Sequence, residues 1–427
     1  MDLKRFFQNR ETRNASWIIG GKVVQMLLSL VVGILTARYL GPTNYGLVNY
    51  GLAYASFFTA LCNLGINSVI VKEFVDHPDE QGEAIGSTIV LRIVSSILSA
   101  VLIVLTSYMI DGDEPVTVAV VALCSIGMIF RVFEVFNYWF QNQYKSKVPS
   151  IVSLIAYVIV SAYKVVLLIL EMDVRWFALA SSVDYAAIAL FLYVSYRRHG
   201  GPKLRFSWRK SRSILKVSYN YILSTIMVVL YGQTDKLMLK QIIGGAEVGY
   251  YATAVAICAM WTFVLQAIID SIYPTILRLK KEDQLAYERK NRQLYAIVFY
   301  VSCIVSVGFL LLGDFVVNLL YGAEFLPASD VLKVVTWYTA FSYLGVARNA
   351  WIVSEGKQKY LKYMYACAAG INIALNSVMI PIWGAVGAAI ASLITEMLTS
   401  ILLPLCIKDL RPSAKLMLEA ISIRKLK

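Results

Sequence analysis

Apolar stretches of about 20 residues alternate with short polar segments along almost the whole chain. A helix of about that length crosses the roughly 30 Å hydrocarbon core of a bilayer, so the pattern predicts an all-α integral membrane protein. Twelve such stretches are expected, approximately at residues 15–40, 47–71, 85–110, 116–140, 148–170, 176–196, 214–243, 249–277, 293–313, 331–353, 361–380 and 385–407. Little of the chain is left for a soluble domain.

The composition supports a membrane protein and argues against a soluble enzyme or a metalloprotein. Of the 427 residues, 58% are hydrophobic and 16% are charged, whereas a soluble domain has about 25% charged residues. The six cysteines lie inside predicted helices without CxxC spacing, and the two histidines lie in polar loops. We therefore expect no catalytic residues, no metal site and no bound cofactor. The N-terminal segment is too polar for a cleaved signal peptide, so the first apolar stretch is predicted to be the first spanning helix.

The formal net charge of +13 would suit a nucleic-acid-binding protein, but the position of the charges indicates topology instead. Four basic residues (Arg38, Arg175, Lys236 and Lys240) fall on one predicted side. The opposite side holds 30, in residues 4–13, 72, 145–147, 197–216, 278–292, 357–362 and 408–427. By the positive-inside rule both termini are predicted to be cytoplasmic and the number of helices to be even. Binding of these loops to anionic membrane lipids stays open, and no nucleic-acid partner is expected.

An internal repeat indicates that the chain consists of two similar halves. Gly41 and Gly46 align with Gly244 and Gly249 at an offset of 203 residues, and WFQNQYKSK (139–147) aligns with WIVSEGKQK (351–359) at an offset of 212. With an even helix count, two such halves form parallel six-helix bundles related by an axis along the membrane normal. The predicted organisation is a cytoplasmic tail (1–14), an N-lobe (15–197), a cytoplasmic linker (198–213), a C-lobe (214–407) and a cytoplasmic tail (408–427).

The aligned glycines follow the first helix of each predicted half. A tight reversal of the chain needs either a positive φ or the absence of a Cβ atom, and Pro42 prevents the helix from continuing. We therefore expect a close turn at residues 41–46 and a second one at 244–249.

Four segments resemble the polysaccharide transporters of the multidrug/oligosaccharidyl-lipid/polysaccharide exporter superfamily, the Wzx-type flippases. They are ARYLGPTNYG (37–46), Asp235 with GGAEVGYYATA (244–254), YGAEFLPASDVL (321–332) and PIWGAVGAAIAS (381–392). The resemblance covers about residues 15–407. It implies a MATE-like fold with two lobes around a cavity that opens alternately to either side. The implied substrate is an undecaprenyl-diphosphate-linked oligosaccharide, carried outward across the bacterial inner membrane for O-antigen, capsule or exopolysaccharide synthesis. The resemblance also admits contact with polysaccharide polymerase machinery.

A glycan and a diphosphate need a polar, hydrated route through the bilayer. Thr59, Asn63 and Asn67 recur at helical spacing, and the 203-residue offset carries them onto Thr262, Gln266 and Asp270. We predict that these two stripes line the route. The alternative is that they only join neighbouring helices.

Cations in the inward halves of helices are the expected ligands of the diphosphate. The candidates are Lys22, with Gln25 on the same helix face, Arg131, Arg348 and, less deeply placed, Arg92. Two of these candidates have a named structural alternative: Glu134, one turn away, would neutralise Arg131, and Arg92 would snorkel to the membrane surface instead of binding the headgroup. Lys164 and Lys333 are placed closer to the outer surface, where they are expected to snorkel.

Asp184, Asp235 and Glu396 are acidic residues inside predicted spanning helices. A carboxylate buried in a membrane either carries a proton or holds Na⁺ with nearby oxygens, so these three residues are candidates for ion coupling. An internal salt bridge is the alternative for each of them, and the sequence does not distinguish H⁺ from Na⁺.

Three other functions were weighed. A cation-coupled exporter of small drugs would share the fold but would have a more acidic cavity. A flippase for lipid II or teichuronic acid fits the same motifs. A membrane-embedded polysaccharide polymerase would need a large outer loop, and the longest outer gap is only about a dozen residues.

Overall fold

The computed structural model describes residues 10–421, and for residues 10–23, Asn220 and Ser224 it describes the backbone alone. All regular elements in this part of the chain are helical. The chain divides into two compact units, Met1–Leu40 with Leu47–Val229 and Gly41–Gly46 with Leu230–Lys427. The long runs of apolar residues produce the helices, because only a helix satisfies all of its backbone hydrogen bonds within lipid.

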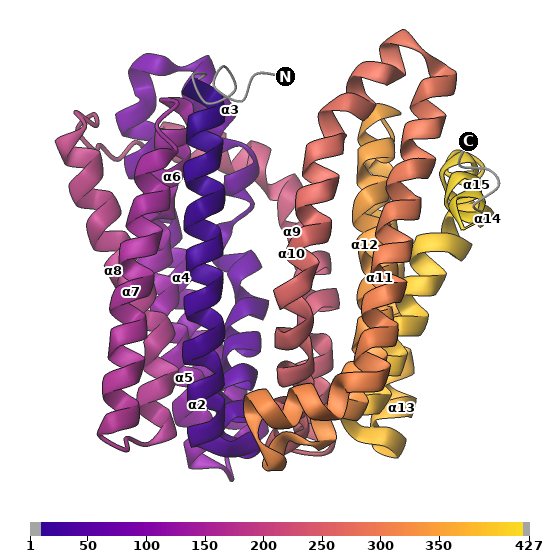
Figure 1. Ribbon diagram of the computed structural model, residues 1–427. Helices are drawn as coiled ribbons and strands as arrows, with labels where there is room; N and C mark the ends of the chain where they lie inside the picture. The colour runs from indigo at the N-terminus through magenta and orange to yellow at the C-terminus, as the bar shows by residue number, and fades with distance from the viewer. Residues whose placement is uncertain (1–9, 422–427) are drawn as a thin grey trace. The chain divides into compact units, whose positions relative to one another are not determined.

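The first unit contains the helices up to residue 229, except for residues 41–46 of α2 (Figure 1). They are α2 (Arg10–Asn63), α3 (Ile70–Asp76), α4 (Gln81–Asp111), α5 (Pro115–Arg131), α6 (Val135–Asn142), α7 (Lys147–Ile169), α8 (Val174–Arg198) and the first part of α9 (Trp208–Ile242), with the short turns η1 (Ile66–Ser68), η2 (Pro78–Glu80) and η3 (Val132–Glu134). Helix α5 packs against α4 and α8, and α7 packs against α8. At one end of the unit, the Tyr196 ring centroid lies 4.4 Å from that of Phe136 and 4.9 Å from that of Trp139.

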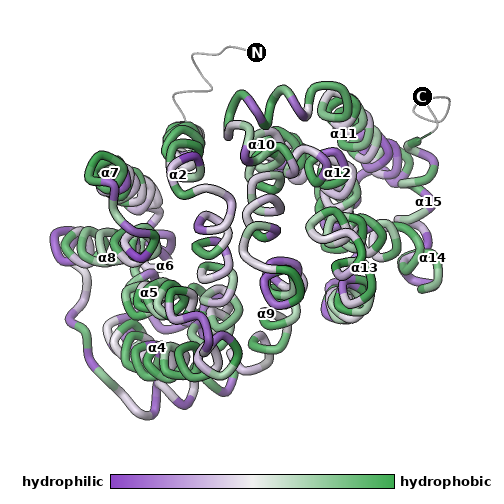
Figure 2. Tube along the Cα trace, turned by 90° about the horizontal axis from the view of Figure 1, so that it is seen from below, coloured by the Kyte–Doolittle hydropathy of each residue, from purple (hydrophilic) through white to green (hydrophobic). Residues whose placement is uncertain are grey.

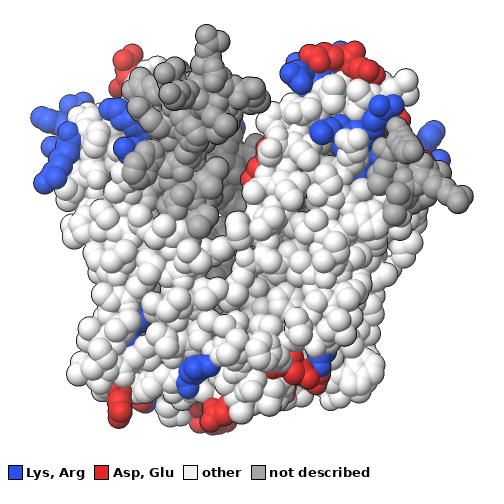
Figure 3. Space-filling model, viewed as in Figure 1, with Lys and Arg blue, Asp and Glu red and all other residues white. Residues whose placement is uncertain are grey.

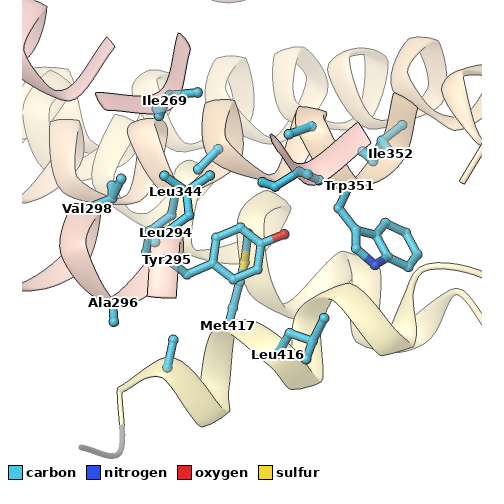
Figure 4. Packing of buried hydrophobic residues seen from close by; sticks show 14 of the residues in the cluster. Ile269, Leu294, Tyr295, Ala296, Val298, Leu344, Trp351, Ile352, Leu416 and Met417 are labelled. Atoms are coloured by element: carbon cyan, nitrogen blue, oxygen red, sulfur yellow. The ribbon is translucent and has the colours of Figure 1, made fainter. Parts of the chain in front are cut away.

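The second unit contains the rest of α9 and the helices that follow. They are α10 (Gly245–Glu282), α11 (Gln284–Tyr321), α12 (Pro327–Ser354), α13 (Leu361–Met397), α14 (Leu403–Cys406) and α15 (Arg411–Ala420), with the turns η4 (Ala323–Phe325), η5 (Gln358–Tyr360) and η6 (Leu398–Leu402). Helix α12 packs against α10, α11 and α13. Figure 4 shows the short α15 closing this core, with Leu416 and Met417 directed toward Tyr295 of α11.

Two glycines interrupt helices that are otherwise continuous. Gly41 in α2 has φ 68° and ψ 172°, and Gly384 in α13 has φ 55° and ψ −132°. These conformations favour glycine, because a Cβ atom would be strained in them. At the second break, the backbone N–H of Ala385 donates to Glu247 Oε2 at 2.6 Å. A carboxylate is well suited to this place, since the first N–H groups of a helix have no partner within the helix.

The two glycine turns pack against each other within the second unit. A Cβ atom on Gly46 would lie 1.8 Å from the backbone oxygen of Gly245, and one on Gly249 would lie 2.1 Å from the backbone oxygen of Pro42. The first glycine of each pair has a positive φ, with 68° at Gly41 and 140° at Gly244. The chain therefore breaks at Gly41 and Gly244, as expected, and the helices resume at once. The second glycine of each pair lies in the first turn of the following helix, where it allows the two backbones to touch.

One expected helix differs from the structure. The stretch predicted as 47–71 ends at Asn63, because Leu64 and Gly65 have φ values of 49° and 65°. Asn67 therefore lies in η1 rather than on the same helix as Thr59. A Cβ atom on Gly65 would lie 2.4 Å from the Ser218 backbone oxygen, so the helix ends where α9 passes close by.

Nine helical stretches of the described residues are long and apolar enough to cross a membrane. Two of them, Val24–Asn63 and Gln358–Cys406, contain the breaks at Gly41 and Gly384, and α12 is not among the nine. Figure 2 shows hydrophobic residues along the helices. In each unit Lys and Arg gather at one end, around the α8–α9 connection in the first unit and the α10–α11 turn in the second (Figure 3). The chain is a multi-pass membrane protein.

Candidate functional site

Thr59 and Arg131 from the predicted polar route lie together in the first unit. Arg131 Nη1 donates to Thr59 Oγ1 at 3.3 Å, and Arg131 Nε lies 3.2 Å from Glu134 Oε1. The guanidinium also lies over the ring of Tyr185, 4.9 Å from its centroid. Arg131 therefore has the acidic partner that the sequence offered as its structural alternative, but its side chain is still 25% exposed. Asn63, at the end of α2, is buried.

Arg92 on α4 is the most deeply buried of the first-unit cations whose side chains are described, with 1% of its surface exposed. Its Nη2 donates to Asn67 Oδ1. Its Nε and Nη1 have no hydrogen-bond partner among the described residues. The structure therefore contradicts the snorkelling alternative for Arg92, because this side chain is buried and bonded to Asn67. A buried guanidinium with unpartnered donors is costly unless an anion or water approaches it.

The other candidate residues of the first unit have fewer described contacts than Arg92 and Arg131. Gln25 is half-buried on α2. Lys22 is part of the same helix, but its side chain lies outside the described residues. Asp184 on α8 is half-buried, and its nearest charge is Lys164 of α7. Its Oδ1 is buried and has no hydrogen-bond partner in the described part of the chain.

Asp235 is the centre of a buried polar cluster in the second unit. Its Oδ1 accepts from Asn376 Nδ2 at 2.7 Å, and its Oδ2 accepts from Ser392 Oγ at 2.8 Å and from Tyr251 Oη at 2.5 Å. Asn372 extends the cluster, because its Oδ1 accepts from Asn376 and its Nδ2 lies 3.1 Å from Ser392 Oγ. Donors from α10 and α13 therefore hold this carboxylate, whereas the sequence suggested a basic neighbour.

Glu396 lies one helical turn from Ser392 on α13. Its Oε1 accepts from Tyr231 Oη at 2.7 Å, and its Oε2 lies 3.2 Å from Ser400 Oγ. Tyr231 and Asp235 are also one turn apart, on α9. The Asp235–Ser392 and Glu396–Tyr231 hydrogen bonds therefore connect α9 and α13 at two successive helical turns. No group of three or more His, Cys, Asp or Glu suited to a metal ion occurs within the described residues.

A pocket of about 140 Å³ lies beside Glu396, wholly within the second unit. Its polar lining is Tyr231, Ser342, Arg348, Asn349, Tyr365, Glu396, Thr399 and Ser400. Arg348 is 6% exposed, and its Nη1 donates to the backbone oxygens of Thr399 at 3.1 Å and Ser400 at 2.8 Å. The structure thus brings the predicted residues Arg348 and Glu396 to one cavity.

The second predicted polar stripe, Thr262, Gln266 and Asp270, lies on α10 and is partly exposed. Thr262 is buried on α10, whereas Asp270 is exposed and accepts from Gln266 Nε2 at 2.9 Å. Lys333 is paired with Asp314 and Asp330, at 2.9 Å from each. This pairing replaces the free snorkelling expected for Lys333.

Comparison with known proteins identifies the group to which this chain is related. Residues 12–280 match the family described as polysaccharide biosynthesis protein, which is more than half of the chain. The chain belongs to this family. Among curated relatives, the capsular polysaccharide biosynthesis protein CapF of Staphylococcus aureus is 20% identical over 90% of this chain and 96% of its own length. A putative O-antigen transporter of Shigella flexneri is 19% identical over 92% and 96%.

Solved structures establish the fold. A lipid II flippase, MurJ, in an inward closed conformation has a TM-score of 0.70 with 15% identity, covering 95% of this chain and 90% of its own. An inward-facing multidrug resistance transporter of the MATE family has a TM-score of 0.67 with 15% identity, covering 93% and 96%. The present chain therefore has the all-helical, MATE-like fold that the resemblance implied.

Several residues of these sites were not among the sequence candidates. Asn372 and Asn376 stand four residues apart in an apolar stretch, a spacing that places both on one helix face and could have indicated the Asp235 cluster. Tyr231 and Tyr251 carried no such signal, because tyrosine is common throughout this chain, with 27 copies.

Proposed function

We propose that this protein is a flippase that moves an undecaprenyl-diphosphate-linked oligosaccharide from the cytoplasmic to the outer leaflet of a bacterial inner membrane by alternating access. Membership of the polysaccharide biosynthesis family and the transporter-like fold support this function. The observation that carries it furthest is Arg92, a buried guanidinium whose Nε and Nη1 lack a partner among the described residues. An anionic headgroup is the ligand that such donors suit.

In this proposal the chain has twelve spanning helices, with both termini in the cytoplasm. The breaks at Gly41 and Gly384 each divide one long element into two helices, and α12 adds a further one. Two lobes at residues 15–197 and 214–407, with the 198–213 linker between them, are then the bodies that move. The clustering of Lys and Arg at one end of each unit supports this orientation (Figure 3).

The substrate route in this proposal is lined by the polar residues of both units. The diphosphate and the sugars nearest to it contact Lys22, Gln25, Arg92, Arg131 and Arg348. The rest of the lining is provided by Thr59, Asn63, Asn67, Gln266 and Asp270. Asp184, Asp235 and Glu396 couple the movement to H⁺ or Na⁺, and the Asp235 cluster offers carboxylate, amide and hydroxyl oxygens of the kind that bind a hard cation.

A cation-coupled exporter of small molecules is the second candidate, because a MATE transporter shares the fold. The buried guanidinium groups of Arg92 and Arg348 favour an anionic substrate over a cationic drug. A flippase for lipid II or teichuronic acid would use the same headgroup chemistry.

The test is surface polysaccharide production in a strain that depends on this protein. Arg92→Ala and Arg131→Ala should abolish export while the amount of protein in the membrane stays unchanged, and Lys22→Arg should be milder than Lys22→Ala. Arg175→Ala is the matched control, because Arg175 is an exposed cation at the start of α8. Normal polysaccharide in the Arg92 and Arg131 variants would refute headgroup binding by these residues.

A further inference from the structure

The pocket beside Glu396 depends on an irregular turn at the end of α13. In η6 the helix widens to a π-turn, and the N–H of Leu403 bonds the backbone oxygen of Leu398, five residues back. The backbone oxygen of Thr399 therefore loses its usual donor, and that of Ser400 has none because Pro404 lacks an N–H. Arg348 Nη1 bonds both of these oxygens. The guanidinium is thereby fixed at the pocket wall by main-chain atoms rather than by an acidic side chain.

A glycine keeps the space between Arg348 and Glu396 open. A Cβ atom on Gly345 would lie 3.9 Å from Arg348 Nη2, 4.0 Å from Glu396 Oε2 and 3.1 Å from Ser400 Oγ. Any larger side chain would enter this space. No ion pair joins Arg348 to Glu396 within the described part of the chain, although both line the pocket. Since a single water needs about 10–15 Å³ of such volume, a pocket of about 140 Å³ has room for several waters beside the carboxyl group.

The hydrogen bonds around Glu396 suit both of its charge states. Tyr231 Oη donates to Oε1 in either state. Ser400 Oγ lies 3.2 Å from Oε2 and 3.1 Å from the backbone oxygen of Phe341, so its one proton serves one acceptor at a time. When Glu396 is ionised, Ser400 donates to Oε2. When Oε2 carries a proton, it donates to Ser400 Oγ, and Ser400 donates to Phe341.

The charged and titratable groups around the pocket favour a proton over a metal cation. Tyr231 of α9, Tyr338 and Arg348 of α12 and Tyr365 of α13 face Glu396, and Asp235 lies one turn away. The guanidinium repels a metal ion in the same pocket. A proton instead forms an O–H bond on the carboxylate and removes its charge, so no separate cation has to remain near Arg348.

We propose that Glu396 is a proton-binding site that exchanges with water in the 140 Å³ pocket, with Arg348 as the residue that positions the pocket wall. The reaction is reversible transfer of one proton from hydronium to Glu396 Oε2, which leaves water and a neutral carboxyl group. This deepens the proposed function, on which its role in transport rests: of the three candidate acids, Glu396 is the one through which a proton gradient acts on flipping.

The first measurement is difference infrared spectroscopy of the purified full chain in lipid nanodiscs as the pH is lowered. A protonated-carboxyl band should appear, and it should be lost in Glu396→Gln but kept in Asp235→Asn. Gly345→Val, which fills the space beside Oε2, should slow exchange of this band in heavy water. Gly370→Val is the matched control, because a Cβ atom on Gly370 meets nothing within 4 Å. An unchanged band in Glu396→Gln, or equal exchange rates in the two valine variants, would overturn the site.

The second measurement is flipping of a fluorescent undecaprenyl-diphosphate trisaccharide in vesicles with an imposed proton gradient. Glu396→Gln should flip the lipid but lose acceleration by the gradient. Equal acceleration of wild type and Glu396→Gln would refute the coupling role while leaving the flippase intact. Absence of flipping by the wild-type protein would instead refute the proposed function, and the infrared result would stand by itself.

Discussion

Replacing Gly249 with alanine should destabilise the protein through a single added methyl group. The new Cβ atom would lie 2.1 Å from the Pro42 backbone oxygen and 2.9 Å from the Pro42 carbonyl carbon. Neither atom belongs to a flexible side chain, so the two turns must separate by more than about 1 Å to restore an ordinary contact. Overpacking of this kind costs about 1–3 kcal/mol.

Gly308→Ala is the control, and it should change the free energy of unfolding in the opposite direction. Gly308 lies inside α11, and a Cβ atom there would meet nothing within 4 Å. Alanine in place of glycine inside a helix contributes up to about 1 kcal/mol. The same chemical change should therefore lower the free energy of unfolding at position 249 and raise it at position 308.

Thermal unfolding in detergent, followed with a thiol-reactive dye, measures this difference. Cys62, Cys124 and Cys258 are free and buried, so they react only as the helices separate. Serine should replace the exposed Cys367 and Cys406, which would otherwise react before unfolding. A melting temperature for Gly249→Ala that equals or exceeds that of Gly308→Ala would refute the close backbone packing of the two turns.

Three further predictions concern topology, movement and the attachment of α9. A cysteine at Trp208, whose side chain is 71% exposed, should react with an impermeant reagent only after the cells are opened; labelling of intact cells would contradict a cytoplasmic linker. Cysteines at Thr43 and Ala246 should form a disulfide that stops polysaccharide export until it is reduced, and full export with the crosslink intact would argue against rocking lobes. Lys210 is 6% exposed and bonds Glu73 at 2.7 Å as well as Glu80, so Lys210→Met should lower the free energy of unfolding by about 1–3 kcal/mol. Burial lowers the pKa of Lys210, but the bonds to Glu73 and Glu80 outweigh it and the net pKa is raised. The contribution of these bonds should therefore be lost as the pH rises above ~10.4. It should also be lost in acid as Glu80, whose pKa the bond to Lys210 lowers, becomes protonated, and melting curves at several pH values would check both limits.

The sequence predicted those features that follow from local pattern. Runs of apolar residues predicted the long helices, and the aligned glycines predicted the turns at 41–46 and 244–249. Thr59 and Arg131 are in contact, whereas the expectation that they line a substrate route stays a prediction. Burial of apolar residues in lipid and the conformational freedom of glycine depend on the residue itself and little on the residues around it, so both can be recognised from the sequence.

Features that depend on distant parts of the chain were not predictable. Asn67 leaves the α2 stripe because the backbone of Ser218, about 150 residues later in the sequence, passes beside Gly65. The buried position of Arg92 follows from this displacement, since Asn67 is its partner. In the π-turn at Leu398–Leu402, Arg348 from another helix bonds two backbone oxygens, and the local sequence does not indicate this partner.

The packing of residues 41–46 against residues 245–249 has a consequence for biosynthesis. The ribosome makes the first segment about 200 residues before the second, and at about 5–20 residues per second this interval is roughly 10–40 s. Throughout that time the Pro42 and Gly46 backbone lacks the surface against which it finally packs. The first helices therefore enter the membrane before their connecting turn is fixed, and slower translation of the intervening residues should lengthen the period in which this turn is accessible to proteases.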